Sequence, residues 1–260
     1  LTGDTVTEPS PSLPWYSGPT LLELLDQVEI EPDVDAGARV RVQTILRTTE
    51  FRGYAGVLSS GSLRPGDELK VSATGQTAVV TRLLALKGEE PVELDGAVPG
   101  QSVAVELDRD IDITRGDLLS AVADAPEPAN RFSADVVWLS EEPLAHGRSY
   151  ILRSGPLEVP TVITAVRHQL DVLTGSELAS RSLGINDIGR VELATNNSVT
   201  LDAYTRCHDT GGFILCDRVT GETVAAGLTR YALRRSTNVT EHIFTVDRAA
   251  RETLGGHAGR

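Results

Sequence analysis

Hydrophobic and polar residues alternate along most of the chain after residue 38, and this alternation predicts β-strands. Val40 and Val42 alternate with Arg41 and Gln43, which is the period of a strand with one buried face. Turn signals rich in Gly and Pro separate the further candidate strands. These are residues 53–59, 68–72, 78–86, 102–107, 117–121, 132–139, 148–152, 160–169, 190–194, 213–217 and 223–231. Many short strands with such punctuation are typical of barrels or sandwiches.

A short amphipathic helix is predicted before the strands. Its apolar stripe follows the i, i+3, i+4, i+7 spacing and consists of Leu21, Leu24, Leu25 and Val28. Pro19 suits the first position of that helix, where a missing N–H costs nothing. One helical turn is expected at residues 175–181, and a short helix capped by Thr245 is expected at residues 246–254.

Two linkers divide the chain. The linkers are residues 31–37 and the Pro-containing stretch 123–130. Neither shows the apolar spacing of a helix or of a strand, as is usual between domains. The predicted segments are a leading loop, helix and linker, then two β-rich domains, then a tail: 1–37, 38–125, 126–235 and 236–260. We therefore predict an all-β fold of two consecutive small β-barrels with short terminal helices.

Charge and composition exclude several classes of protein. The formal net charge is −13, and the only adjacent basic pair is Arg234-Arg235, so a nucleic acid or an anionic membrane is not an expected partner. No apolar run approaches the ~20 residues of a spanning helix, and no secretory signal opens the chain. With only two cysteines, the chain is predicted to be cytoplasmic.

The motifs that would carry chemistry are missing or weak. The chain has no P-loop, so the DxxG spacing at residues 209–212 is interpreted as a hairpin turn. Cys207 and Cys216 lack the paired spacing of a zinc site, and a disulfide between them is disfavoured in a cytoplasmic protein. Asp110 and Asp112 alternate with isoleucines, which favours an edge segment with one polar face over a catalytic carboxylate pair.

Three stretches together resemble one protein family. They are GDTV at 3–6 with WYSGPTLL at 15–22, FRGYAG at 51–56, and DVVWL at 135–139 with TGGFI at 210–214. In this combination they resemble the large subunit of the two-subunit sulfate adenylyltransferase, a translation-factor-like GTPase. Thr5 replaces the Asn that is usual in the first stretch. The second stretch is also similar, more distantly, to domain II of elongation factor Tu-like GTPases.

The resemblance implies a role for each segment. Residues 38–125 and 126–235 would be barrels of the elongation-factor domain II and domain III type. Residues 1–37 would be the tail of a GTPase domain with a linker helix, and residues 236–260 would lead toward an adenylylsulfate kinase domain, as in bifunctional members. The chain contains no Met and is expected to be the middle of a longer protein. That parent is implied to use GTP, ATP and magnesium in sulfate assimilation.

None of the family's catalytic, cofactor-binding or metal-binding residues maps onto this chain, which by itself is expected to be inactive and to hold no cofactor. Its implied partners are its own GTPase domain and the catalytic small subunit. Trp15, Tyr16, Arg52 and Tyr54 are the candidate contacts with another domain or a partner, because aromatic and Arg side chains suit such surfaces. For Trp15 and Tyr16, cover of a local core is the alternative. The rival classes are a translation-type elongation factor, a stand-alone β-barrel binding module and an unrelated β-barrel enzyme.

Overall fold

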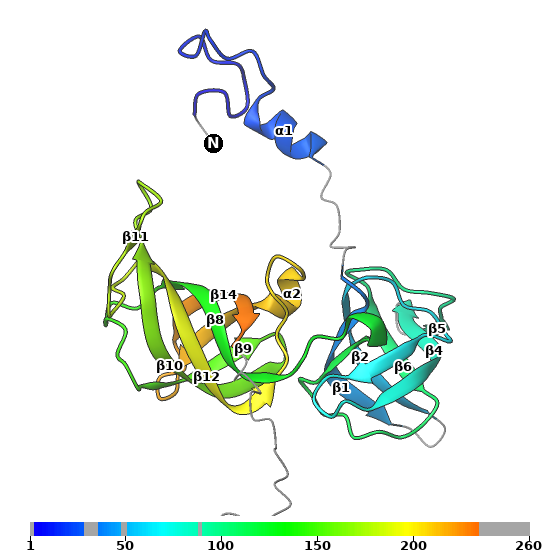
Figure 1. Ribbon diagram of the computed structural model, residues 1–260. Coiled ribbons are helices and arrows are strands. Elements are labelled where there is room, and N and C mark those ends of the chain that lie inside the picture. Colours follow the sequence, from blue (N-terminus) through cyan, green and yellow to red (C-terminus); the bar gives the residue numbers. More distant parts are fainter. Residues whose placement is uncertain (1–2, 29–35, 48–50, 88–89, 234–260) are drawn as a thin grey trace, which may run out of the picture.

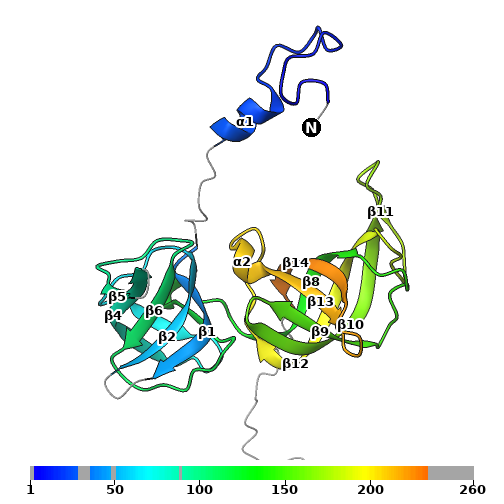
Figure 2. The same cartoon turned by 180° about the vertical axis from the view of Figure 1, so that it is seen from behind.

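Two β-barrels lie side by side, and an N-terminal helical segment precedes them (Figure 1). The computed structural model describes residues 3–28, 36–47, 51–87 and 90–233. Figure 2 shows the same arrangement from behind, with a single connector passing between the barrels. The all-β prediction of two consecutive small barrels is confirmed.

The first barrel closes through six antiparallel strands in the order β3-β7-β1-β2-β6-β4, with β4 pairing back onto β3. A further short strand, β5, extends the sheet from the far end of β4. The strands are β1 (Arg39–Arg47), β2 (Arg52–Ser60), β3 (Glu68–Val71), β4 (Thr77–Lys87), β5 (Glu90–Glu93), β6 (Ser102–Leu107) and β7 (Leu118–Ala121). A 3₁₀ turn, η1 (Val122–Asp124), then opens the connector.

The second barrel closes in the same manner, in the order β10-β12-β8-β14-β13-β9, with β9 pairing back onto β10. The strand β11 forms a hairpin with the end of β10 and stands away from the barrel (Figure 1). The strands are β8 (Ala129–Trp138), β9 (Ser149–Ser154), β10 (Leu157–Leu170), β11 (Glu177–Leu178), β12 (Ile188–Val199), β13 (Gly212–Asp217) and β14 (Thr223–Ala232). Residues 218–222 form the predicted hairpin turn between the last two strands.

Each barrel has its own core, because the side chains alternate between the inside and the outside of the closed sheet. The first core is aliphatic apart from Tyr54. The second contains more aromatic rings, among which Trp138 and Tyr150 meet edge to face with ring centroids 5.8 Å apart. Such a pair contributes about 1 kcal/mol beyond the area that it buries.

The N-terminal helix α1 (Leu21–Gln27) begins later than the sequence predicts. Thr20 is its N-cap and forms a capping box with Glu23, so Pro19 lies before the cap and not at the first helical position. The helix begins after Thr20 because Thr20 Oγ1 accepts a hydrogen bond from the otherwise unpaired N–H of Glu23 at 3.2 Å. The leucines of α1 remain exposed, so the predicted apolar stripe contacts no core in the described residues.

Two further predictions are wrong. The expected helical turn at 175–181 is instead the β10–β11 hairpin, whose tip is held by Asp171 through Leu173 N and Thr174 Oγ1. Residues 209–212, read as a hairpin turn, fall largely within the single-turn helix α2 (His208–Gly211), which leads directly into β13. The predicted helix at 246–254 and the tail 236–260 lie outside the described residues.

Candidate functional site between the barrels

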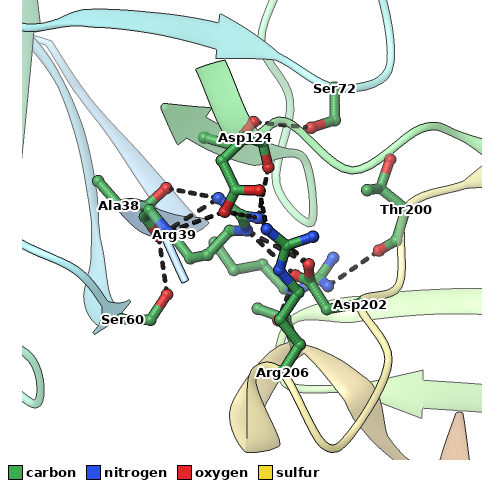
Figure 3. Close-up of polar contacts among 12 residues, drawn as sticks. Ala38, Arg39, Ser60, Ser72, Asp124, Thr200, Asp202 and Arg206 are labelled. Carbon is green, nitrogen blue, oxygen red and sulfur yellow. Dashed lines mark hydrogen bonds and ion pairs between the residues drawn. The ribbon is translucent and has the colours of Figure 1, made fainter. Parts of the chain in front are cut away.

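A buried arginine of β1 connects the two barrels (Figure 3). The Arg39 side chain is 0% exposed, and its Nε donates to Asp202 Oδ2 of the second barrel at 3.2 Å. Its Nη2 donates to the backbone carbonyl of Asp124 at 2.6 Å and to the Asp124 carboxylate at 3.1 Å. One guanidinium thus joins the first barrel, the connector and the second barrel.

The far side of Asp202 is held by α2. Thr210 Oγ1, which is buried, donates to Asp202 Oδ2 at 2.6 Å. The carboxylate therefore accepts bonds from both barrels, and its negative charge balances Arg39 in a site without water access. The short helix α2 has a structural reason: it turns Thr210 toward the junction before β13 begins.

Asp124, the last residue of η1, is the second carboxylate at the junction. Burial alone would raise its pKa, but the N–H of Gly37 and the charges of Arg39 and Arg206 outweigh burial and hold the pKa of Asp124 below its usual value. The carboxylate is therefore ionised at neutral pH. We refer to Arg39, Asp124, Asp202, Arg206 and Thr210 as the interbarrel joint.

A second buried arginine of β1 reinforces the interbarrel joint. Arg41 donates from Nη1 to Gly116 O at 3.1 Å and from Nη2 to Thr200 O at 3.0 Å, so it too spans the barrels. Burial lowers the pKa of Arg41 to about 10, with Asp202 and other nearby groups opposing that shift. The side chain remains charged at neutral pH, and it donates to one backbone carbonyl from each barrel.

The charged groups of the interbarrel joint bind one another. Its carboxylates are occupied by arginine and hydroxyl donors, and no nucleophile stands beside a free base in it. Within the described ranges, no group of three or more His, Cys, Asp or Glu side chains is placed to bind a metal ion. Cys207 and Cys216 are both free and buried.

The four residues singled out from the sequence lie away from the interbarrel joint. Trp15 is 77% exposed and meets Tyr16 edge to face, with ring centroids 6.0 Å apart. The Tyr16 hydroxyl donates to Pro19 O at 2.8 Å, which folds the segment before α1 into a compact loop. A contact role for these two rings stays a prediction.

Arg52 and Tyr54 are neighbours on β2. Tyr54 is 1% exposed and its hydroxyl donates to Ile111 O at 3.2 Å, so its ring belongs to the first core. The Arg52 guanidinium lies 5.6 Å from the centroid of that ring and pairs with Asp110 at 2.5 Å. A contact role for Arg52 and Tyr54 stays a prediction. Asp110 and Asp112 are exposed while Ile111 and Ile113 are buried, as their alternation predicts.

Sequence reasoning missed the interbarrel joint entirely. The alternation in β1 is correct for Val40 and Val42, but it assigns Arg39 and Arg41 to a solvent face. Both arginines are buried, because that face lies against the second barrel. The partners Arg39 and Asp202 are 163 residues apart, and no local spacing indicates their contact.

The fold is that of two consecutive barrels of the elongation-factor domain II and domain III type. Residues 131–230 match the family model described as GTP-eEF1A C-terminal domain-like. A crystal structure of Sup35 complexed with GDP superposes with a TM-score of 0.70 at 23% identity, over 89% of this chain and 57% of that one. A likeness at this identity speaks for the fold alone.

The relatives narrow the class to one family. The chain is 42% identical over 243 residues to sulfate adenylyltransferase subunit 1 of Vibrio cholerae, covering 93% of this chain and 50% of that protein. It is 40% identical to the bifunctional enzyme NodQ of Azospirillum brasilense, covering 95% of this chain and 40% of that protein. The chain is thus a homologue of the sulfate adenylyltransferase subunit 1 family and spans about half the length of its relatives. None of the helices in the described ranges is long and apolar enough to cross a membrane.

Proposed function

We propose that this chain supplies the two barrel domains that follow the GTPase domain in the large subunit of a sulfate adenylyltransferase. In that role the barrels couple GTP hydrolysis to the synthesis of adenylylsulfate from ATP and sulfate in the cytoplasm. The parent would use GTP, ATP and magnesium, and, where a kinase is fused, would also carry adenylylsulfate kinase activity. The barrels themselves perform no step of this chemistry.

The interbarrel joint is the observation that carries the proposal. A body that relays the nucleotide state of one neighbour to another must resist bending between its two ends. Arg39 and Arg41 reach the second barrel from one strand through a carboxylate and a backbone carbonyl, and both are buried. In this proposal the two barrels move together as one rigid unit between the GTPase domain and the catalytic small subunit. The identity to sulfate adenylyltransferase subunit 1 favours this role over that of a translation factor.

The isolated chain offers a direct test. We expect these 260 residues alone to show no GTP binding in calorimetry, because they contain no P-loop. We expect them to associate only weakly with the catalytic small subunit, because the proposed contact also needs a GTPase domain. Adding the GTPase domain in cis should strengthen that association. Micromolar affinity for GTP in the isolated chain, or equal binding of the small subunit with and without the GTPase domain, would contradict the proposal.

A further inference from the structure

A cavity of about 170 Å³ is lined by residues of both barrels and by no residue of the interbarrel joint. The first barrel supplies Arg41 of β1 and the loop 114–118, and the second supplies residues 157–159 and 197–200. The volume is several times the ~30 Å³ that one water molecule occupies in the liquid. It is smaller than the ~300 Å³ at which pockets for drug-sized ligands begin. The cavity therefore suits a small ligand.

Arg41 brings a buried positive charge to this cavity. The residue is 6% exposed, and its two terminal nitrogens donate to Gly116 O and Thr200 O, which are uncharged acceptors. Its Nε is buried, and no described group accepts a hydrogen bond from it. Asp202 favours the charged form of Arg41, but its carboxylate already binds Arg39. Arg41 thus has one N–H left to donate and no carboxylate of its own among the described residues.

The carboxylates that line the cavity already have donors. Asp117 Oδ2 accepts from the N–H and the hydroxyl of Thr114 at 2.7 and 3.0 Å. Glu158, whose side chain is 58% exposed, pairs with Arg153 at 3.1 Å. Arg115 is exposed and donates to a backbone carbonyl, without an ion pair to any described residue. The lining therefore combines two arginines that no carboxylate pairs with and two carboxylates that are already occupied.

An anion matches this lining better than a neutral acceptor does. A water molecule at Arg41 Nε would accept the hydrogen bond but would leave the buried guanidinium without a counter-charge. An anion supplies both, and a hydrogen bond between ionised groups is about twice as strong as one between neutral groups. Asn197 and Ser198 line the same cavity, and amide and hydroxyl groups are further donors for an anion.

We propose that this cavity binds one small inorganic anion, which accepts a hydrogen bond from Arg41 Nε and is attracted by the charge of Arg115. The inference is independent of the proposed function, because it needs only these two barrels. Since both barrels line the cavity, the bound anion adds a contact between them. A ligand that binds only the folded state stabilises it in proportion to its occupancy, so the anion stabilises the packing of the barrels.

Titration with chloride, followed by the line width of the ³⁵Cl NMR signal, tests the proposal on the 260-residue chain. We expect saturable broadening from one site. R115Q removes a positive charge from the lining and should raise Kd about threefold, and E158Q removes a negative charge and should lower it about threefold. The control is R82Q, at an arginine that is 45% exposed and lies outside this lining, and its Kd should match the wild type.

Competing anions identify which kind the cavity takes. Sulfate or phosphate that narrows the chloride signal assigns the site to oxyanions, and chloride that neither displaces assigns it to halides. In crystals soaked in sodium bromide, an anomalous peak within hydrogen-bonding distance of Arg41 Nε would place the ion directly. Three results would overturn the proposal: no saturable binding of chloride, sulfate or phosphate up to about 100 mM, equal effects of R115Q and R82Q, or only water density at Arg41 Nε.

Discussion

At the scale of single residues, Arg39 and Asp202 determine how the barrels meet. Both side chains are almost fully buried, so neither charge is solvated by water. Burying either ion alone costs several kcal/mol, and the pair is tolerated because each oxygen and most of the guanidinium hydrogens have partners. The geometry of the interbarrel joint is therefore specified by the need to satisfy these charges together.

Asp202→Asn is the sharpest test at this scale. The substitution leaves Arg39 buried without its counter-charge, so we expect the free energy of unfolding at pH 7 to fall by about 3–5 kcal/mol. Urea unfolding followed by circular dichroism measures the change. Asp112→Asn, at an exposed carboxylate, is the control and should change stability by less than about 0.5 kcal/mol. An equally small loss of stability in Asp202→Asn would show that the ion pair between Arg39 and Asp202 does not stabilise the fold.

At the scale of elements, β1 is unusual because both of its faces are buried over its first four residues. It packs inward with Val40 and outward against the second barrel with Arg39 and Arg41. The neighbouring strand β2 must approach β1 closely, and Gly56 permits this at the irregular register between Val42 and Thr44. A Cβ at Gly56 would lie 2.3 Å from Arg41 O.

Gly56→Ala should therefore move β2 away from β1. We expect a loss of about 1–3 kcal/mol in the free energy of unfolding, because the obstructing atom is backbone and cannot rotate aside. Gly184→Ala is the control, since its Cβ would meet nothing closer than Asp187 Oδ2 at 3.5 Å. Thermal melts of both variants measure the change, and the control should be as stable as the wild type or slightly more stable. Equal melting temperatures for the two variants would contradict this account of β1.

At the scale of the whole molecule, the interbarrel joint connects two barrels that have separate cores. Asp124 lies on the connector and pairs with Arg39 from the first barrel and Arg206 from the second barrel. Its pKa is lowered in the fold despite its burial. A carboxylate with a lowered pKa adds stability above its unfolded pKa of about 4, and this contribution is lost as the pH falls through the folded value.

The pH dependence of stability tests that statement. The wild-type chain should keep a constant contribution from Asp124 above about pH 5 and lose it progressively below about pH 4. Asp124→Asn should be less stable at pH 7 and should show a shallower fall across the acid range. Urea midpoints measured from pH 7 to pH 3 give both slopes, with Asp112→Asn expected to follow the wild type. Parallel wild-type and Asp124→Asn curves would exclude Asp124 as a source of the acid sensitivity.

The sequence by itself determined the elements and the class of fold. Strand periodicity located most of β1 to β14 within a few residues, because a closed barrel repeats the inside–outside alternation along each strand. It missed β5, which contains Pro91 and two acidic residues, and it read the β10–β11 tip as helical. In both places the residues are polar and show no strand alternation, but they form a strand because a neighbouring strand pairs with them.

Only the tertiary structure decided which charged side chains are buried between the barrels. Arg39 and Asp202 lie 163 positions apart, and they form a buried ion pair because the two barrels pack against each other. A groove on the first barrel is lined by residues that come from β1, β2, β4 and β6, which are separated along the chain. The spacing of hydrophobic residues is a local property, so the sequence alone reveals it. The burial of a charged side chain depends on a distant segment that covers it, so only the folded structure reveals it.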